Sequence, residues 1–155
     1  MADSRFGGPV AVTITPDGRF LYAVNPGCTA AILDTQKNPT TPASPDIGLP
    51  SASAQVGEVV IGCDPTDVKA LSTDQRVVAV DADGTVADES TLSWIDTSTR
   101  RLVGREVPLG MGSGEVATGV AFTPNDDEAH VLHRKREGGG GGSLSVVPMS
   151  RLQPQ

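Results

Sequence analysis

Apolar and polar residues alternate over short segments of this chain, and turn residues separate the segments. Between Val10 and Ile14 every second residue is a large aliphatic one, which is the period of a half-buried β-strand. The tripeptide at residues 16–18 then combines Pro, Asp and Gly, a composition typical of a tight turn. Two further apolar segments follow, Phe20 to Val24 and Thr29 to Leu33. The pattern predicts a strand, a turn, a second strand, a loop and a third strand.

The same reasoning predicts short strands along the rest of the chain. They are Glu58 to Ile61, Val68 to Leu71, Arg76 to Val80, Thr91 to Ile95, Arg101 to Val107, Thr118 to Phe122, Ala129 to Leu132 and Leu144 to Val147. Helical periodicity is absent, and Gly or Pro interrupts every window in which a helix could form. The expected fold class is therefore all-β.

Turn and strand-end residues recur along the chain. The turn at Pro16 is repeated at Thr123-Pro124-Asn125-Asp126, and the strand end at Ile32 to Thr35 is repeated at Trp94 to Thr97. Matching turns lie about 50 to 60 residues apart, and about 40 to 50 without inserted loops. We expect three four-stranded antiparallel meanders, at about residues 8–61, 62–109 and 110–150, with a Pro/Ser/Thr-rich inserted loop at 37–55 and a glycine-run loop at 138–142.

Composition limits the partners of the chain. With 155 residues it is long enough for one domain, and its formal net charge of −7 disfavours binding to a phosphate backbone, so we predict no nucleic-acid partner. The short basic run that begins at His133 is interpreted as a solvated loop. No apolar run long enough for a membrane span is present, and the N-terminus lacks a signal-peptide core. The compartment stays open: cytoplasmic by default, or extracytoplasmic if a longer precursor exists.

The repeats resemble the β-propeller family named after its Tyr-Val-Thr-Asn tetrad. The first unit carries the resemblance best, with Pro16-Asp17-Gly18, then Tyr22-Ala23-Val24-Asn25, then Ile32-Leu33-Asp34-Thr35. The second unit keeps Gly62-Cys63-Asp64-Pro65 and Ile95-Asp96-Thr97 but loses the Pro-Asp-Gly turn. In the third unit His133 stands where the first has Asn25. The resemblance implies a partial β-propeller of about three four-stranded antiparallel blades.

Propellers of this family and the related lactonase propellers commonly close a ring of seven blades, whereas this chain supplies about three. An open array leaves unpaired sheet edges and exposed blade faces at both ends. The resemblance therefore implies that the remaining blades, or self-association, are needed to close the ring. We expect the chain to be a fragment of a longer protein; assembly with copies of itself and a partial gene product are the alternatives.

In a propeller blade, the loops that enter the first strand and the loops that join the second and third strands emerge on one face. This rim is the predicted site for a small ligand or a protein partner, with candidate residues Asn25, Asp64, Asp67, Asp81, Asp83 and His133. The aspartates are better explained by turn preference than by a metal site, so no metal and no cofactor are predicted. Cys28 and Cys63 lie on successive rim loops, where a disulfide is the alternative to the default of two free thiols.

The sequence leaves three functional hypotheses. The leading one is a noncatalytic propeller repeat protein or fragment that binds through its rim. The alternative is a lactonase-type hydrolase acting on a sugar lactone, for which His133 is the candidate catalytic residue. The loop that begins at Gly110 fits neither a phosphate-binding loop nor a nucleophile elbow, because the required Lys, following helix and glycine spacing are missing. A fragment that does not fold stably alone is the third hypothesis.

Overall fold

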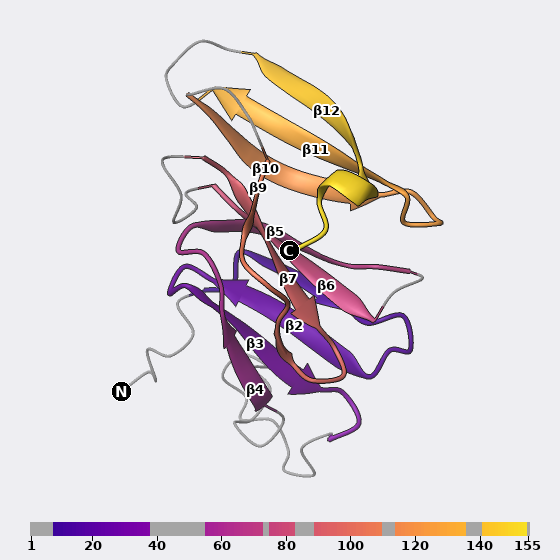
Figure 1. The fold of residues 1–155 in the computed structure, drawn as a ribbon. Coiled ribbons are helices and arrows are strands. Elements are labelled where there is room, and N and C mark those ends of the chain that lie inside the picture. The colour runs from indigo at the N-terminus through magenta and orange to yellow at the C-terminus, as the bar shows by residue number, and fades with distance from the viewer. Residues whose placement is uncertain are drawn as a thin grey trace.

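The computed structural model describes residues 8–37, 55–72, 75–82, 89–109, 114–135 and 141–154. Three antiparallel sheets follow one another along the chain and stack side by side (Figure 1). One turn of 3₁₀ helix, η1 (Met149–Arg151), is the one helical element of these ranges. The all-β fold class predicted from the sequence is confirmed.

Sheet 1 is a meander of four strands in the order of the chain. Its strands are β1 (Ala11–Ile14), β2 (Phe20–Asn25), β3 (Thr29–Asp34) and β4 (Gln55–Val60). The β1–β2 turn is closed by the amide of Gly18, which donates to the carbonyl of Thr15 at 2.8 Å. Gly18 has φ of 71°, a conformation that favours glycine. The turn chemistry read from the sequence therefore sets the register of the first hairpin.

Sheet 2 contains β5 (Pro65–Ala70), β6 (Arg76–Asp81) and β7 (Thr91–Asp96), which also form a meander. The single strand predicted from Arg101 to Val107 is wrong. Two two-residue strands, β8 (Arg101–Leu102) and β9 (Val107–Pro108), each pair with β7 instead. Gly104 lies between them with φ of 67°, and this left-handed conformation interrupts the strand.

Sheet 3 has three strands in the described ranges, one fewer than the meander expected for this unit. They are β10 (Glu115–Phe122), β11 (Glu128–Lys135) and β12 (Gly142–Pro148). After β12 the chain turns into η1, whose Met149 packs with sheets 2 and 3. The chain segment that follows the third strand therefore joins the core between two sheets.

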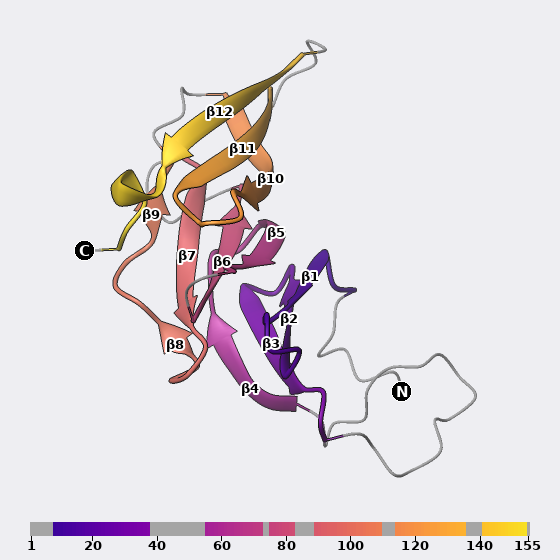
Figure 2. The same ribbon diagram turned by 90° about the vertical axis from the view of Figure 1, so that its right-hand side faces the viewer.

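Sheet 2 lies between the other two sheets and packs against both (Figure 2). The molecule has one hydrophobic core between sheets 1 and 2 and another between sheets 2 and 3, and alternate residues of strand β6 point into each. Val77 and Ala79 pack against sheet 1, while Val78 and Val80 pack against sheet 3. We call the face of a sheet that packs on the next sheet along the chain its back face, and the opposite face its front face. The first strands of the three sheets, β1, β5 and β10, lie beside one another.

Candidate functional site

The same turn between first and second strand gives the three sheets a common register. The amides of Thr15, Leu71 and Thr123 each donate to the carbonyl of the residue five positions later. Counterpart positions can therefore be identified from the backbone rather than from sequence similarity.

Each sheet carries a polar residue at the rim end of its second strand, ten positions after the residue whose amide closes the turn (Thr15, Leu71 or Thr123). These counterparts are Asn25, Asp81 and His133. Strand alternation places all three on the front face. Asn25 and Asp81 each follow a valine, Val24 or Val80, that points to the back face. His133 lies two residues after Val131, which points to the front face. The sequence had identified the first and third as counterparts, and the structure adds that Asp81 is the second.

All three counterparts are almost completely buried, with exposed fractions of 4% for Asn25, 0% for Asp81 and 4% for His133. Each has side-chain atoms without a hydrogen-bond partner: Oδ1 of Asn25, Oδ1 of Asp81 and both ring nitrogens of His133. Buried polar atoms are normally paired, and one left unpaired costs about 1 to 3 kcal/mol. The three positions therefore hold unused hydrogen-bonding capacity at one end of the stack.

The Asp81 carboxyl lies at the junction of sheets 1 and 2. Oδ2 accepts a hydrogen bond from the Ser93 hydroxyl at 3.3 Å. Gly62, in the connection from sheet 1, packs directly on the carboxyl group, so that a side-chain carbon there would overlap it. Burial raises the pKa of Asp81 to about 7, and the negative charges of Glu106 and Asp64 act in the same direction. Asp81 is therefore protonated in much of the population near neutral pH.

His133 is held in its neutral form. Burial lowers its pKa below the ordinary value, and the nearby negative charge of Glu115 opposes that effect only in part. A neutral imidazole has one donor and one acceptor nitrogen. At neutral pH the rim thus offers an amide, a partly protonated carboxyl and a neutral imidazole.

The other predicted rim aspartates have different surroundings. The Asp67 carboxylate bridges two sheets: Oδ2 accepts from the Val120 amide at 3.0 Å, while Oδ1 accepts from the Val68 amide and from Nζ of Lys69. Its role is to hold β5 to β10, so it does not project from the rim. Asp64 is exposed in the connection between sheets 1 and 2. Asp83 lies outside the described residues, and within the described ranges no three acidic, His or Cys side chains gather as metal ligands.

Cys28 and Cys63 form a disulfide in the structure, in place of the two free thiols expected by default. The bond joins the β2–β3 loop to the connection between sheets 1 and 2. Beside it the amide of Ile61 donates to the carbonyl of Cys28 at 2.9 Å. The rim end of sheet 1 is therefore tied covalently to the start of sheet 2, close to Gly62.

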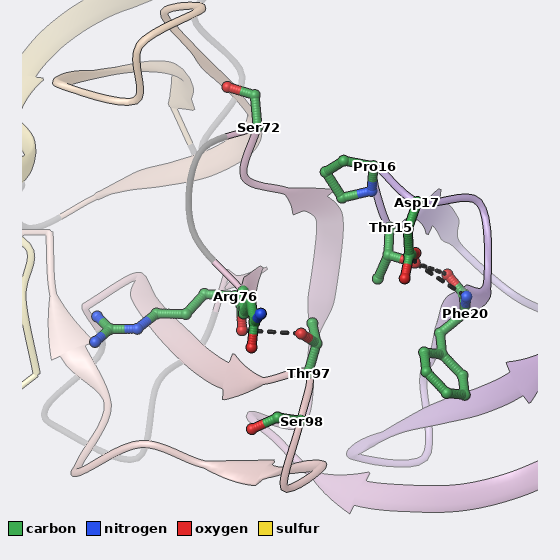
Figure 3. Close-up of a pocket in the computed structure, with 9 residues that line it drawn as sticks. Thr15, Pro16, Asp17, Phe20, Ser72, Arg76, Thr97 and Ser98 are labelled. Carbon is green, nitrogen blue, oxygen red and sulfur yellow. Dashed lines mark hydrogen bonds between the residues drawn. The ribbon is translucent and has the colours of Figure 1, made fainter.

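A pocket of about 320 Å³ opens at the opposite end of the stack, between the turns of sheets 1 and 2 (Figure 3). Sequence reasoning missed it, although recurring turn residues line it: Thr15, Pro16, Asp17, Phe20, Ser72, Gln75, Arg76, Thr97 and Ser98. Most of its hydroxyls serve the turns themselves; that of Ser72, for example, donates to the carbonyl of Pro124 at 2.7 Å. The Arg76 guanidinium extends away from the pocket, toward Gln153 and the Trp94 ring.

Among solved structures, the chain is similar to the β-propeller domain of Cps50 (Swd1) from Myceliophteria thermophila, with a TM-score of 0.62 and 14% sequence identity. The match covers 94% of this chain and 40% of that one, so this chain spans less than half of its length. At this identity the likeness concerns the fold alone, which is of the β-propeller type. No family model and no curated protein matches the sequence. No helix within the described ranges is long and apolar enough to span a membrane.

Proposed function

We propose that this chain is a noncatalytic β-propeller unit, related to the Tyr-Val-Thr-Asn repeat propellers, that binds a small ligand or a protein partner through its rim. The observation that carries the proposal is the set of counterpart positions. One backbone frame places Asn25, Asp81 and His133 at the same point of three sheets, and their chemistry differs in each. Repeats that share a frame and vary one polar position are suited to recognition.

The unpaired atoms of these side chains favour the rim as the binding site, rather than the pocket at the other end of the stack. A partner that supplied hydrogen bonds to them would recover part of the free energy lost by burying them unpaired. The pocket offers less, since most of its hydroxyls are already engaged in turns. The neutral amide and imidazole favour a neutral polar ligand, such as a sugar or a peptide segment, over a highly charged one.

Amide chemical-shift mapping tests the proposal. We would add a panel of neutral sugars, amides and short peptides to the ¹⁵N-labelled protein. Shift changes are expected at Asn25, Asp81 and His133 and their sequence neighbours, with at least tenfold weaker binding in His133→Ala. Thr97→Ala is the matched control at the opposite end and should bind normally. Shift changes confined to the pocket around Thr97 would contradict the proposal.

The lactonase alternative is tested separately, with sugar lactones as substrates. Among the described residues no carboxylate is hydrogen-bonded to either nitrogen of His133, so the structure provides no oriented general base. We expect lactone hydrolysis by the wild-type protein to match the buffer rate. Turnover in the wild type that disappears in His133→Ala would show that the protein is an enzyme.

A further inference from the structure

The Asp81 carboxyl lies beneath the chain segment that connects sheets 1 and 2. Gly62 in this connection is buried and packs so closely on the carboxyl that a side-chain carbon there would overlap it. The next two residues, Cys63 and Asp64, are exposed, so this part of the cover lies at the surface. Asp81 itself is 0% exposed, and its Oδ1 atom has no hydrogen-bond partner among the described residues. A ligand gains access to Oδ1 when the connection moves.

Bonds at both ends and in the middle hold the connection in place. At its start, the amide of Ile61 donates to the carbonyl of Cys28 at 2.9 Å. At its end, the amide of Ala82 donates to the carbonyl of Asp64 at 2.8 Å. Between these hydrogen bonds, the disulfide joins Cys63 to Cys28 in the β2–β3 loop. Of the three bonds the disulfide alone is covalent, so its redox state determines how firmly the connection is held over Asp81.

Cys28 has a counterpart in sheet 2, which is Ser90. Each of the two precedes the third strand of its sheet. The carbonyl of Cys28 accepts the amide of Ile61, and the carbonyl of Ser90 accepts the amide of Leu109 at 3.0 Å. The Ser90 hydroxyl then accepts the amide of Ala117 in sheet 3 at 2.9 Å. At this position sheets 2 and 3 are therefore tied by a hydrogen bond, whereas sheets 1 and 2 are tied by a bond that a reductant can break.

The disulfide is open to a reductant, and one of its cysteines occupies an unusual backbone position. Cys63 is exposed and Cys28 is half-buried, and exposed disulfides are the ones that exchange readily with thiols. Cys28 has φ of 63°, in the left-handed region that favours glycine. It ends a three-residue loop between the paired residues Asn25 and Thr29, where glycine is the ordinary choice. The cysteine is therefore explained by its sulfur and not by its backbone preference.

We propose that the disulfide between Cys28 and Cys63 is a redox latch, which holds the connection closed over Asp81 and opens it when a dithiol reduces the bond. The proposal rests on the proposed ligand binding at the rim and adds its regulation. A thiolate of the dithiol attacks Sγ of Cys63, which forms a mixed disulfide and releases the Cys28 thiolate. The second thiol of the reductant then displaces Sγ of Cys63. The reductant ends as a disulfide, and the protein gains two electrons and two protons as two thiols.

Amide hydrogen exchange, measured by NMR without ligand, tests the latch on the oxidised and the reduced wild-type protein. The amides of Ile61 and Ala82 hold the two ends of the connection, so we expect each to exchange about tenfold faster after reduction. The amide of Leu71 is the internal control at the opposite end of sheet 2, where it donates to the Arg76 carbonyl at 3.0 Å. Unchanged rates at Ile61 and Ala82, or an equal rise at Leu71, would overturn the proposal.

A double variant, Cys28→Ser/Cys63→Ser, separates opening of the latch from other effects of the reductant. We expect its Ile61 and Ala82 amides to exchange as fast as in the reduced wild type, and to be unaffected by dithiothreitol. Circular dichroism melting checks that the variant is folded at the temperature of the measurement. Exchange as slow as in the oxidised wild type would show that the hydrogen bonds alone hold the connection, which contradicts the latch.

Ligand titration of the oxidised and reduced proteins links the latch to the rim. We expect neutral sugars, amides or short peptides to bind about tenfold more tightly after reduction, with the largest additional shift changes at Asp81 and Gly62. Equal affinity in both forms would overturn the control of binding by the disulfide. Binding by neither form, with exchange still accelerated by reduction, would contradict the rim-binding function and support the latch, so the two proposals fail separately.

Discussion

Among the three counterpart residues Asn25, Asp81 and His133, Asp81 has a carboxyl group whose pKa is raised to about 7. Its carboxyl is fully buried between Gly62 and Ser93, with negative rather than positive charge nearby. A carboxylate in such surroundings is costly, and the protein avoids part of that cost by binding a proton near pH 7.

Asp81 should make the folded state less stable as the pH rises. Between about pH 4 and 7 the folded protein keeps a proton on Asp81 that the unfolded chain releases, so the free energy of unfolding falls across this range. Asp81→Asn removes the ionisation, and we expect it to raise that free energy by about 1 to 4 kcal/mol at pH 8 and much less at pH 4. Urea unfolding at both pH values measures it, with exposed Glu58→Gln as control. An equal effect at both pH values would contradict the assignment.

At the scale of elements, side chains from one sheet satisfy backbone groups of the next. The Asp67 carboxylate accepts the Val120 amide, the Thr66 hydroxyl donates to Ala117, and the Thr13 hydroxyl accepts the Ala70 amide at 3.0 Å. These bonds fix neighbouring first strands without a continuous ladder between them.

Removing the Asp67 carboxylate should weaken the junction of sheets 2 and 3. Asp67→Ala leaves the amides of Val68 and Val120 without this acceptor, so we expect a loss of about 1 to 3 kcal/mol in the free energy of unfolding. Lys69→Ala is the matched control, because it removes only a half-exposed ion pair and should cost less than about 1 kcal/mol. Urea titration of both variants gives the comparison. Equal losses would show that the ion pair, not the bridge, carries the effect.

The disulfide between Cys28 and Cys63 acts at the same scale, because it links two elements 35 residues apart. Closing a loop of this length stabilises a folded chain by about 3 to 4 kcal/mol in the chain-entropy model. We expect a reductant to lower the melting temperature of the wild type and to leave that of a Cys28→Ser/Cys63→Ser variant unchanged. Alkylation with mass spectrometry reports the thiols directly. Two alkylated cysteines in native, unreduced protein would contradict the bond.

At the scale of the whole molecule, the stacking of the sheets determines which apolar side chains are buried. Leu92 of sheet 2 and Leu144 of sheet 3 occupy the same position in their strand pairings, each opposite the ninth residue after the turn. Leu92 is 0% exposed because sheet 3 covers it, whereas Leu144 is 58% exposed.

The sequence by itself determined most of the strands and turns of this protein, because these depend on residues close together in the chain. The segment from Val10 to Leu33 was read correctly, since alternation and the Pro-Asp-Gly turn are local signals. The interruption at Gly104 was missed, because glycine alone does not reveal that its φ will be positive.

Only the tertiary structure decided what the polar residues do. Asp67 was predicted at the rim but bonds to an amide 53 residues away, and the counterpart role of Asp81 appeared only in the backbone register. The burial of Leu92 and the exposure of Leu144 depend on which sheet lies next in the stack. The physical reason is the same in each case: burial and pairing across sheets depend on contacts between segments far apart in the chain, which local patterns do not specify.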